Sequence, residues 1–105
     1  MPKGYWIVRV DARDEAAYKD YLALNGRAFA RYGGRFLVRG GPFDNPVGAS
    51  RGRNVVIEFP DLEAARACWA SAEYQEARAR QRGTAETDLV IIGGYDGPQP
   101  GDALS

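Results

Sequence analysis

The sequence has no histidine among its 105 residues and only one cysteine, Cys68. Without histidine there is no Ser-His-Asp triad, no histidine general base, no histidine-ligated haem and no ordinary zinc or iron site. A lone cysteine cannot form an internal disulfide, and without a histidine it is a poor candidate for a thiol nucleophile. We therefore expect no metal and no cofactor, and Cys68 fits a reducing compartment.

Excess charge and long apolar runs are also missing. Lys+Arg and Asp+Glu both number 14, so no net field attracts the chain to nucleic acid or to an anionic membrane. No apolar stretch approaches the roughly 20 residues of a membrane span, and the start of the chain, Met1 to Gly4, lacks a signal-peptide core. Among the basic residues only Lys3 and Lys19 are lysines, and all others are arginines. Codon usage in a high-GC genome explains this preference for arginine as well as anion recognition does. We expect a cytoplasmic, bacterial protein that binds neither nucleic acid nor membrane.

The chain does contain strand-like runs that are apolar at both odd and even positions. They are Tyr5–Val10, Phe36–Val38, Val55–Phe59 and Leu89–Ile92. A half-exposed strand alternates apolar and polar residues, because successive side chains point to opposite faces of the sheet. Both faces of this sheet are therefore expected to be buried. Helix-like runs are too few to cover both, so the pattern favours a second copy of the chain as the cover.

The remaining segments place two helices between the strands. Asp14 and Asp61 are typical N-caps, and Ser71 is expected to cap a restart of the second helix. Strands are expected at 5–10, 35–39, 54–59 and 88–92, a loop at 42–52 and a disordered tail at 96–105. The order β-α-β, β-α-β predicts an α+β, ferredoxin-like domain over 3–95, with a four-stranded antiparallel sheet and two helices on one face. A βαββαβ fold with an apolar open face fits a dimeric α+β barrel.

Several segments carry a resemblance to a known family. They are Gly4-Tyr5-Trp6, Tyr32 to Gly41, Val56 to Pro60, and Ser71 to Gln75. In order and spacing they resemble the domain of unknown function 1330 family over nearly the whole chain. The departure at Ala72, where the family often has proline, concerns only a helix start. The resemblance implies a dimeric α+β barrel and implies almost nothing about chemistry.

The first candidate site lies on the sheet face opposite the helices. Strand phase predicts that Arg9, Arg39 and Glu58 share this face with apolar side chains such as Ile7 and Leu37. Two arginines against one carboxylate leave a positive surplus that could hold a small carboxylate or phosphate. The alternative is an ion-pair network that only sets the register of a dimer.

The second candidate is the crevice between sheet and helices, near Tyr18, Tyr21, Trp69 and Tyr74. Apolar pockets with a few polar groups commonly bind small molecules, but aromatic residues at helical spacing are more often plain core. The 42–52 loop is expected either to form a lid or to be a simple connection. RNA-binding domains with the βαββαβ layout stack bases on several aromatic residues of the sheet. Tyr5 is the only aromatic residue expected on the open face, so the sequence does not favour RNA binding.

Three functions remain open from the sequence. The first is a cofactor-independent enzyme acting on a small anionic or aromatic metabolite. Its actors would be Arg39 and Arg9 as oxyanion stabilisers, Glu58 as acid or base and Tyr18 as a hydrogen-bond donor. The second is a dimer that binds or senses a ligand without turnover, and the third is a purely structural homodimer. Whether the protein is an enzyme, and on what substrate, stays open at this stage.

Overall fold

The computed structural model describes residues 2–102 and has the ferredoxin-like βαββαβ order expected from the sequence. The four strands form one antiparallel sheet in the order β2-β3-β1-β4. In these residues no helix is long and apolar enough to cross a bilayer. The elements are β1 (Gly4–Ala12), α1 (Glu15–Arg31), β2 (Arg35–Arg39), β3 (Arg53–Phe59), α2 (Leu62–Ala70), α3 (Ala72–Gln81) and β4 (Ala85–Gly93).

The helices begin where their capping residues predict. The Asp14 carboxylate accepts a hydrogen bond from the Ala17 N–H at 3.1 Å, and that of Asp61 accepts one from the Ala64 N–H at 2.7 Å. Ser71 accepts from the Tyr74 N–H at 3.1 Å, so the second helical region is two helices that meet at this residue. α1 ends before Gly33, whose φ of +75° is the left-handed conformation that closes many helices.

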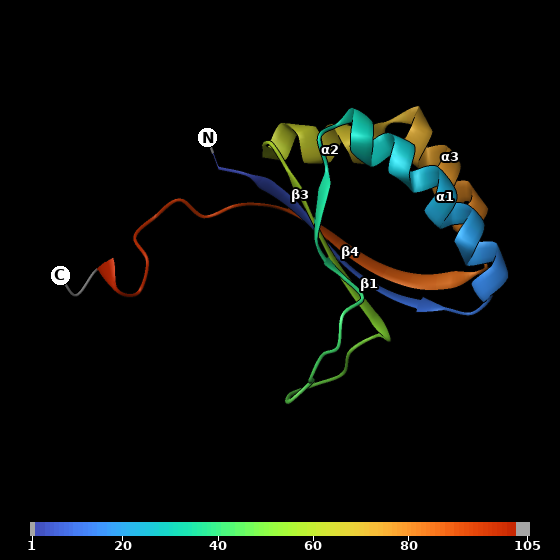
Figure 1. Ribbon diagram of the computed structural model, residues 1–105, viewed down its shortest axis with the longest axis horizontal. Helices are drawn as coiled ribbons and strands as arrows, with labels where there is room; N and C mark the ends of the chain where they lie inside the picture. Colours follow the sequence, from blue (N-terminus) through green and yellow to red (C-terminus); the bar gives the residue numbers. More distant parts are fainter. Residues whose placement is uncertain (1, 103–105) are drawn as a thin grey trace.

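All three helices cover the same face of the sheet (Figure 1). α1 packs beside α3, and α2 packs against β1. No helix of the described part of the chain lies on the opposite face, and the β2–β3 loop leads away from the sheet on that side (Figure 1). Residues 96–102 contain no α-helix or strand and extend away from the domain (Figure 1), whereas 103–105 of the expected tail lie outside the described residues.

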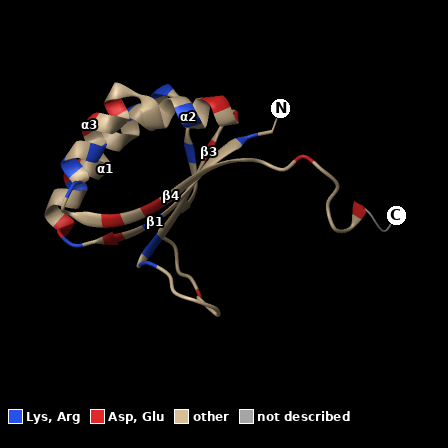
Figure 2. Cartoon of the chain, turned by 180° about the vertical axis from the view of Figure 1, so that it is seen from behind, with Lys and Arg blue, Asp and Glu red and all other residues tan. Residues whose placement is uncertain are grey.

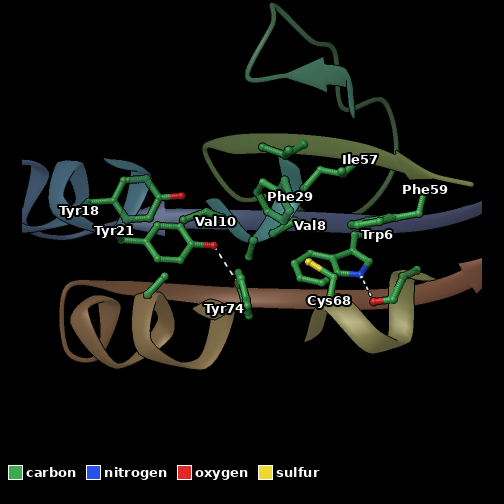
Figure 3. Packing of buried hydrophobic residues seen from close by; sticks show 14 residues of the cluster. Trp6, Val8, Val10, Tyr18, Tyr21, Phe29, Ile57, Phe59, Cys68 and Tyr74 are labelled. Carbon is green, nitrogen blue, oxygen red and sulfur yellow. Dashed lines mark hydrogen bonds between the residues drawn. The ribbon is translucent and has the colours of Figure 1, made fainter. Parts of the chain in front are cut away.

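Trp6 lies at the centre of the core between sheet and helices, and 1% of its surface is exposed (Figure 3). Its indole Nε1 donates a hydrogen bond to the carbonyl of Ala65 at 2.9 Å, which ties β1 to α2. The ring meets Tyr74 and Phe29 edge-on, with centroids 4.8 and 5.3 Å away. Gly4 allows this close approach, since a Cβ there would lie 2.7 Å from the Leu62 Cα.

The strands differ from expectation at their ends and in one interior position. β3 begins one residue earlier than expected, at Arg53, and β4 runs from Ala85 to Gly93, beyond the expected 88–92. β2 has the expected bounds but contains a bulge: Phe36 pairs with Ile57, and Val38 pairs with the adjacent Val56. A bulge places two residues of one strand opposite one residue of its partner, so it shifts the phase of every residue after it.

Candidate functional site

The sheet face without helices, called the open face here, carries an apolar patch. Ile7 and Val38 are 42% exposed and Val90 is 53% exposed. These values are high for large aliphatic side chains that lie side by side, and contiguous exposed patches of this kind usually mark an interaction surface. The patch consists of Ile7, Leu37, Val38, Val56, Val90 and Ile92.

Arg9 and Glu58 both lie on the open face, as predicted, but at different places. Arg9 is opposite Asn54 on β3 and Asp88 on β4. Glu58 is opposite Tyr5, whose hydroxyl donates to it at 3.4 Å, and its carboxylate lies 4.0 Å from the Arg35 Nε. The two residues are four strand positions apart, or about 13 Å at the usual rise of a strand. They do not form one cluster.

Arg39 lies on the other side of the sheet, so the predicted cluster of Arg9, Arg39 and Glu58 is wrong. Because of the bulge, Arg39 pairs with Val55, a buried residue of the helix-covered face. Its guanidinium packs over the Phe36 ring, 4.3 Å from the ring centroid. Simple alternation from Phe36 would place Arg39 on the open face. The bulge adds one residue to the strand, so Arg39 lies on the opposite face.

Between the sheet and α1 the structure has two adjacent hollows. The inner cavity, of about 30 Å³, reaches the core at Trp6 and Phe29 and has Asn25 and Arg39 among its walls. The outer groove, of about 480 Å³, lies between the end of β1, the first half of α1 and the base of the β2–β3 loop, where Figure 2 shows basic residues. Both hollows are lined by Val10, Tyr18, Leu22 and Arg53.

Tyr18 lines both hollows and lies beside Tyr21 (Figure 3). Burial, together with the neighbouring Tyr21, raises the pKa of Tyr18 from 10.0 to about 12, while the charge of Arg53 acts in the opposite direction. At neutral pH its hydroxyl is therefore protonated and can donate a hydrogen bond. The Tyr21 and Tyr74 hydroxyls bond to each other at 2.8 Å, as the dashed line in Figure 3 marks.

Trp69 belongs to the core and does not line either hollow. Its ring contacts Trp6 and Tyr74, with centroids 6.0 and 5.4 Å away, and Arg78 lies over it at 4.9 Å. Of the aromatic residues expected in the crevice, Tyr18 and Tyr21 line the inner cavity, whereas Tyr74 contacts the Tyr21 ring from within the core. Whether any candidate residue binds a ligand stays a prediction.

Two polar residues of the inner cavity were missed by the sequence reading, Asn25 and Arg53. Asn25 is 4% exposed and lies on the buried stripe of α1, among apolar and aromatic side chains. Arg53 has the same strand phase as Val55, Ile57 and Phe59, so alternation could have placed it on the helix face. It was missed because β3 was expected to start one residue later.

A third arginine, Arg51, anchors the end of the β2–β3 loop. Its guanidinium pairs with Asp88 at 2.8 Å, Asp11 at 3.0 Å and Glu86 at 3.1 Å, and the Asp11 carboxylate also accepts the Gly52 N–H at 2.7 Å. These bonds connect the start of β3 to the ends of β1 and β4. In residues 2–102, no group of three or more acidic or cysteine side chains could hold a metal ion, and this includes the three carboxylates around Arg51.

The fold and the hollow between sheet and helices define a ferredoxin-like α+β protein with an apolar open face. The chain belongs to the family described as domain of unknown function 1330 (DUF1330), which matches residues 3–95. The resemblance read from its motifs is thereby confirmed. No curated protein matches the chain by sequence.

Solved structures with the same fold share little sequence with this chain. A protein of unknown function from Rhodopseudomonas palustris superposes with a TM-score of 0.73 at 17% identity, covering 91% of this chain and 85% of that one. SnoaB, a cofactor-independent oxygenase from Streptomyces nogalater, superposes with a TM-score of 0.62 at 14% identity, covering 95% and 99%. An ethyl tert-butyl ether D family protein from Bacillus halodurans gives 0.55 at 14% identity, covering 90% and 100%. At these identities the likeness concerns the fold alone.

Proposed function

We propose that this protein is a homodimer that binds a small aromatic or anionic metabolite between the sheet and α1 of each protomer. The observation that carries the proposal is that the inner cavity and the outer groove lie side by side and share Tyr18, Leu22 and Arg53 as walls. A groove of about 480 Å³ falls in the range of small-molecule sites. The adjacent inner cavity has mostly apolar and aromatic walls with a few polar groups, which is the usual composition of such sites.

The open face supports the dimeric part of the proposal. Its patch of Ile7, Leu37, Val38, Val56, Val90 and Ile92 lies across all four strands. Covering such a patch removes apolar surface from water, at about 25 cal/mol for each Å² buried. A second sheet with the same patch is the complement that the chain itself can supply. Arg9 and Glu58 would then be interface residues, where paired charges set register.

The second candidate function is catalysis without a cofactor, which the fold shared with SnoaB favours. The groups available for it differ from those expected, because Arg9 and Glu58 lie across the sheet from the cavity. Arg39 is left to stabilise a developing oxyanion, and Tyr18 to donate a hydrogen bond. The raised pKa of Tyr18 makes it an acid or donor at neutral pH and a poor base.

A thermal-shift screen over small organic acids and phenols tests the proposal, with each hit confirmed by calorimetric titration. Leu22 is a wall of both hollows, so Leu22→Trp places a large ring in them. We expect this variant to abolish binding of every hit. Ala23→Trp adds the same ring at an exposed position of the same helix and should leave binding intact. Equal binding by both variants contradicts the proposed site.

The same hits separate binding from catalysis. After prolonged incubation in air with catalytic amounts of protein, a ligand recovered chemically unchanged by mass spectrometry indicates binding alone. A new product that Leu22→Trp fails to form indicates an enzyme. If the protein is a dimer that no compound of the screen stabilises, the result would instead support a homodimer with a purely structural role.

A further inference from the structure

Arg39 and Arg53 come from neighbouring strands and line the same inner cavity. The bulge puts Arg39 opposite Val55, and Arg53 lies two residues before Val55 on the same face. In an antiparallel pair such diagonal neighbours have Cα atoms about 7–8 Å apart, well within reach of two long side chains. Both basic side chains therefore line one largely apolar cavity, although like charges held near each other in this way repel.

Neither guanidinium is paired with a carboxylate in the described part of the chain. Arg39 lies against the Phe36 ring, and the Nε of Arg53 is buried without a hydrogen-bond partner. A buried donor without a partner loses its hydration and gains nothing in return, so folded proteins rarely leave one unsatisfied. Arg51, two residues before Arg53, pairs with three carboxylates, which shows that acidic side chains are within reach of this loop.

The charges around the two hollows favour one additional negative group. The basic side chains are Lys19, Arg39 and Arg53, and the acidic ones are Asp11 and Glu15. Asp11 is already held by Arg51 and by the Gly52 N–H. A single anionic group between the two arginines would relieve their repulsion and give the Arg53 Nε an acceptor.

We propose that this cavity selects small aromatic carboxylic acids, whose carboxylate is held by Arg39 and Arg53 and whose ring lies against the apolar side chains of the groove. This rests on the proposed function and names its ligand class. The planar guanidinium matches a carboxylate with two parallel hydrogen bonds. Phe36 orients Arg39, and Tyr18, which lines both hollows, has a hydroxyl that can donate a further bond.

Calorimetric titration with 2-naphthoate and with 2-naphthamide tests the ligand class. The two probes share their ring system, and only the acid is charged. We expect the acid to bind at least about tenfold more tightly, since hydrogen bonds to charged groups contribute about 1.5–3 kcal/mol. Arg53→Gln and Arg39→Gln should each weaken naphthoate binding by about 10- to 100-fold and leave the amide unaffected.

The matched control is Arg66→Gln, because Arg66 is an exposed residue of α2 whose guanidinium lies 3.9 Å from the Glu63 carboxylate. It should bind naphthoate as the unchanged protein does. Arg53→Lys keeps the charge but loses the planar fork, so intermediate affinity is expected. Thermal melting of each variant shows whether it is folded, and Arg39→Gln provides the test if Arg53→Gln is not.

The outcomes separate this inference from the proposed function. If acid and amide bind equally, and Leu22→Trp abolishes both, the cavity is a binding site but the choice of carboxylates is wrong. If naphthoate binds equally well to Leu22→Trp, both are overturned. If naphthoate does not bind at millimolar concentration, the choice of aromatic carboxylates is overturned, and the proposed function then depends on the hits of the thermal-shift screen. Unchanged naphthoate affinity in Arg39→Gln and Arg53→Gln also overturns the inference.

Discussion

Several polar side chains of this protein lie inside its hydrophobic core. The hydrogen-bond partner of each side chain decides how much free energy its burial costs. The Tyr21 and Tyr74 hydroxyls are buried and hydrogen-bonded to each other at 2.8 Å. Cys68 is fully buried among apolar neighbours, so its thiol behaves as a small apolar group. Burial raises the pKa of all three groups, because the charged form of each would lack solvation.

Removing one hydroxyl of the tyrosine pair should destabilise the fold. In Tyr74→Phe the buried Tyr21 hydroxyl loses its hydrogen bond to Tyr74, and we expect the free energy of unfolding to fall by about 1–2 kcal/mol in urea titration. The double variant Tyr21→Phe with Tyr74→Phe leaves no orphaned hydroxyl, so its loss should be smaller than the sum of the single losses. Strictly additive losses would show that the two hydroxyls do not interact.

The Cys68 thiol predicts a loss of stability in alkaline solution. Burial raises its pKa from 9.0 to about 12, so above pH 9 the unfolded chain gives up a proton that the folded chain keeps. The contribution is complete below pH 9 and is lost progressively as the pH rises toward 12. The urea midpoint should therefore fall between pH 8 and pH 10, and by less in Cys68→Ala. Equal falls in the two proteins would exclude the thiol as the cause.

Among the secondary-structure elements, β2 matters most for the candidate site. Its bulge turns Arg39 from the open face to the inner cavity, and the chain then turns at Gly40 with a φ of +69°. A Cβ at Gly40 would lie 3.3 Å from the Arg53 side chain. The turn after β2 therefore controls the positions of both arginines.

Gly40→Ala should cost about 1–2 kcal/mol of unfolding free energy, because an L-residue is strained at this positive φ. It should also weaken binding of any cavity ligand, since the added methyl presses on Arg53. The neighbouring Gly41 is the natural control: nothing lies within 4 Å of its Cβ position, and Gly41→Ala should change stability by less than about 0.5 kcal/mol. Urea titration of both variants measures the difference, and equal stabilities would contradict the argument from Gly40.

For the molecule as a whole, the two faces of the sheet have different roles in our proposals. One face packs on the three helices and shapes the cavity, and the other carries the apolar patch. Burial of the patch in a homodimer would stabilise the fold and also make its stability depend on protein concentration. The ligand site and the dimer interface would then be separated by the thickness of one sheet.

A lysine in the centre of the patch should break the dimer. Val90 lies opposite Ile7 and is 53% exposed in the single chain, so Val90→Lys leaves the monomer core intact but puts a charge into the interface. Sedimentation equilibrium should show the dimer dissociation constant rising by at least about tenfold. Ala79→Lys, at an exposed position of α3, should sediment as the unchanged protein does. A monomer before any substitution would refute the proposed pairing.

The local signals in the sequence determined most of the architecture. Asp14, Asp61 and Ser71 satisfy the first N–H groups of their own helices, and such contacts between near neighbours can be recognised without knowing the fold. The phase of β1 was also predictable, because Trp6 and Ile7 alternate between the two faces along an unbroken ladder. These features define the βαββαβ order and the apolar open face.

The composition of the site was decided only by the tertiary structure. The face on which Arg39 lies depends on how β2 pairs with β3, and a bulge between Phe36 and Val38 reverses it without any change in composition. Arg53 and Asn25 became site residues because β3 and α1 meet around one cavity. Register between strands is set by contacts distant in sequence, which is why the pattern of a single strand could not place Arg39.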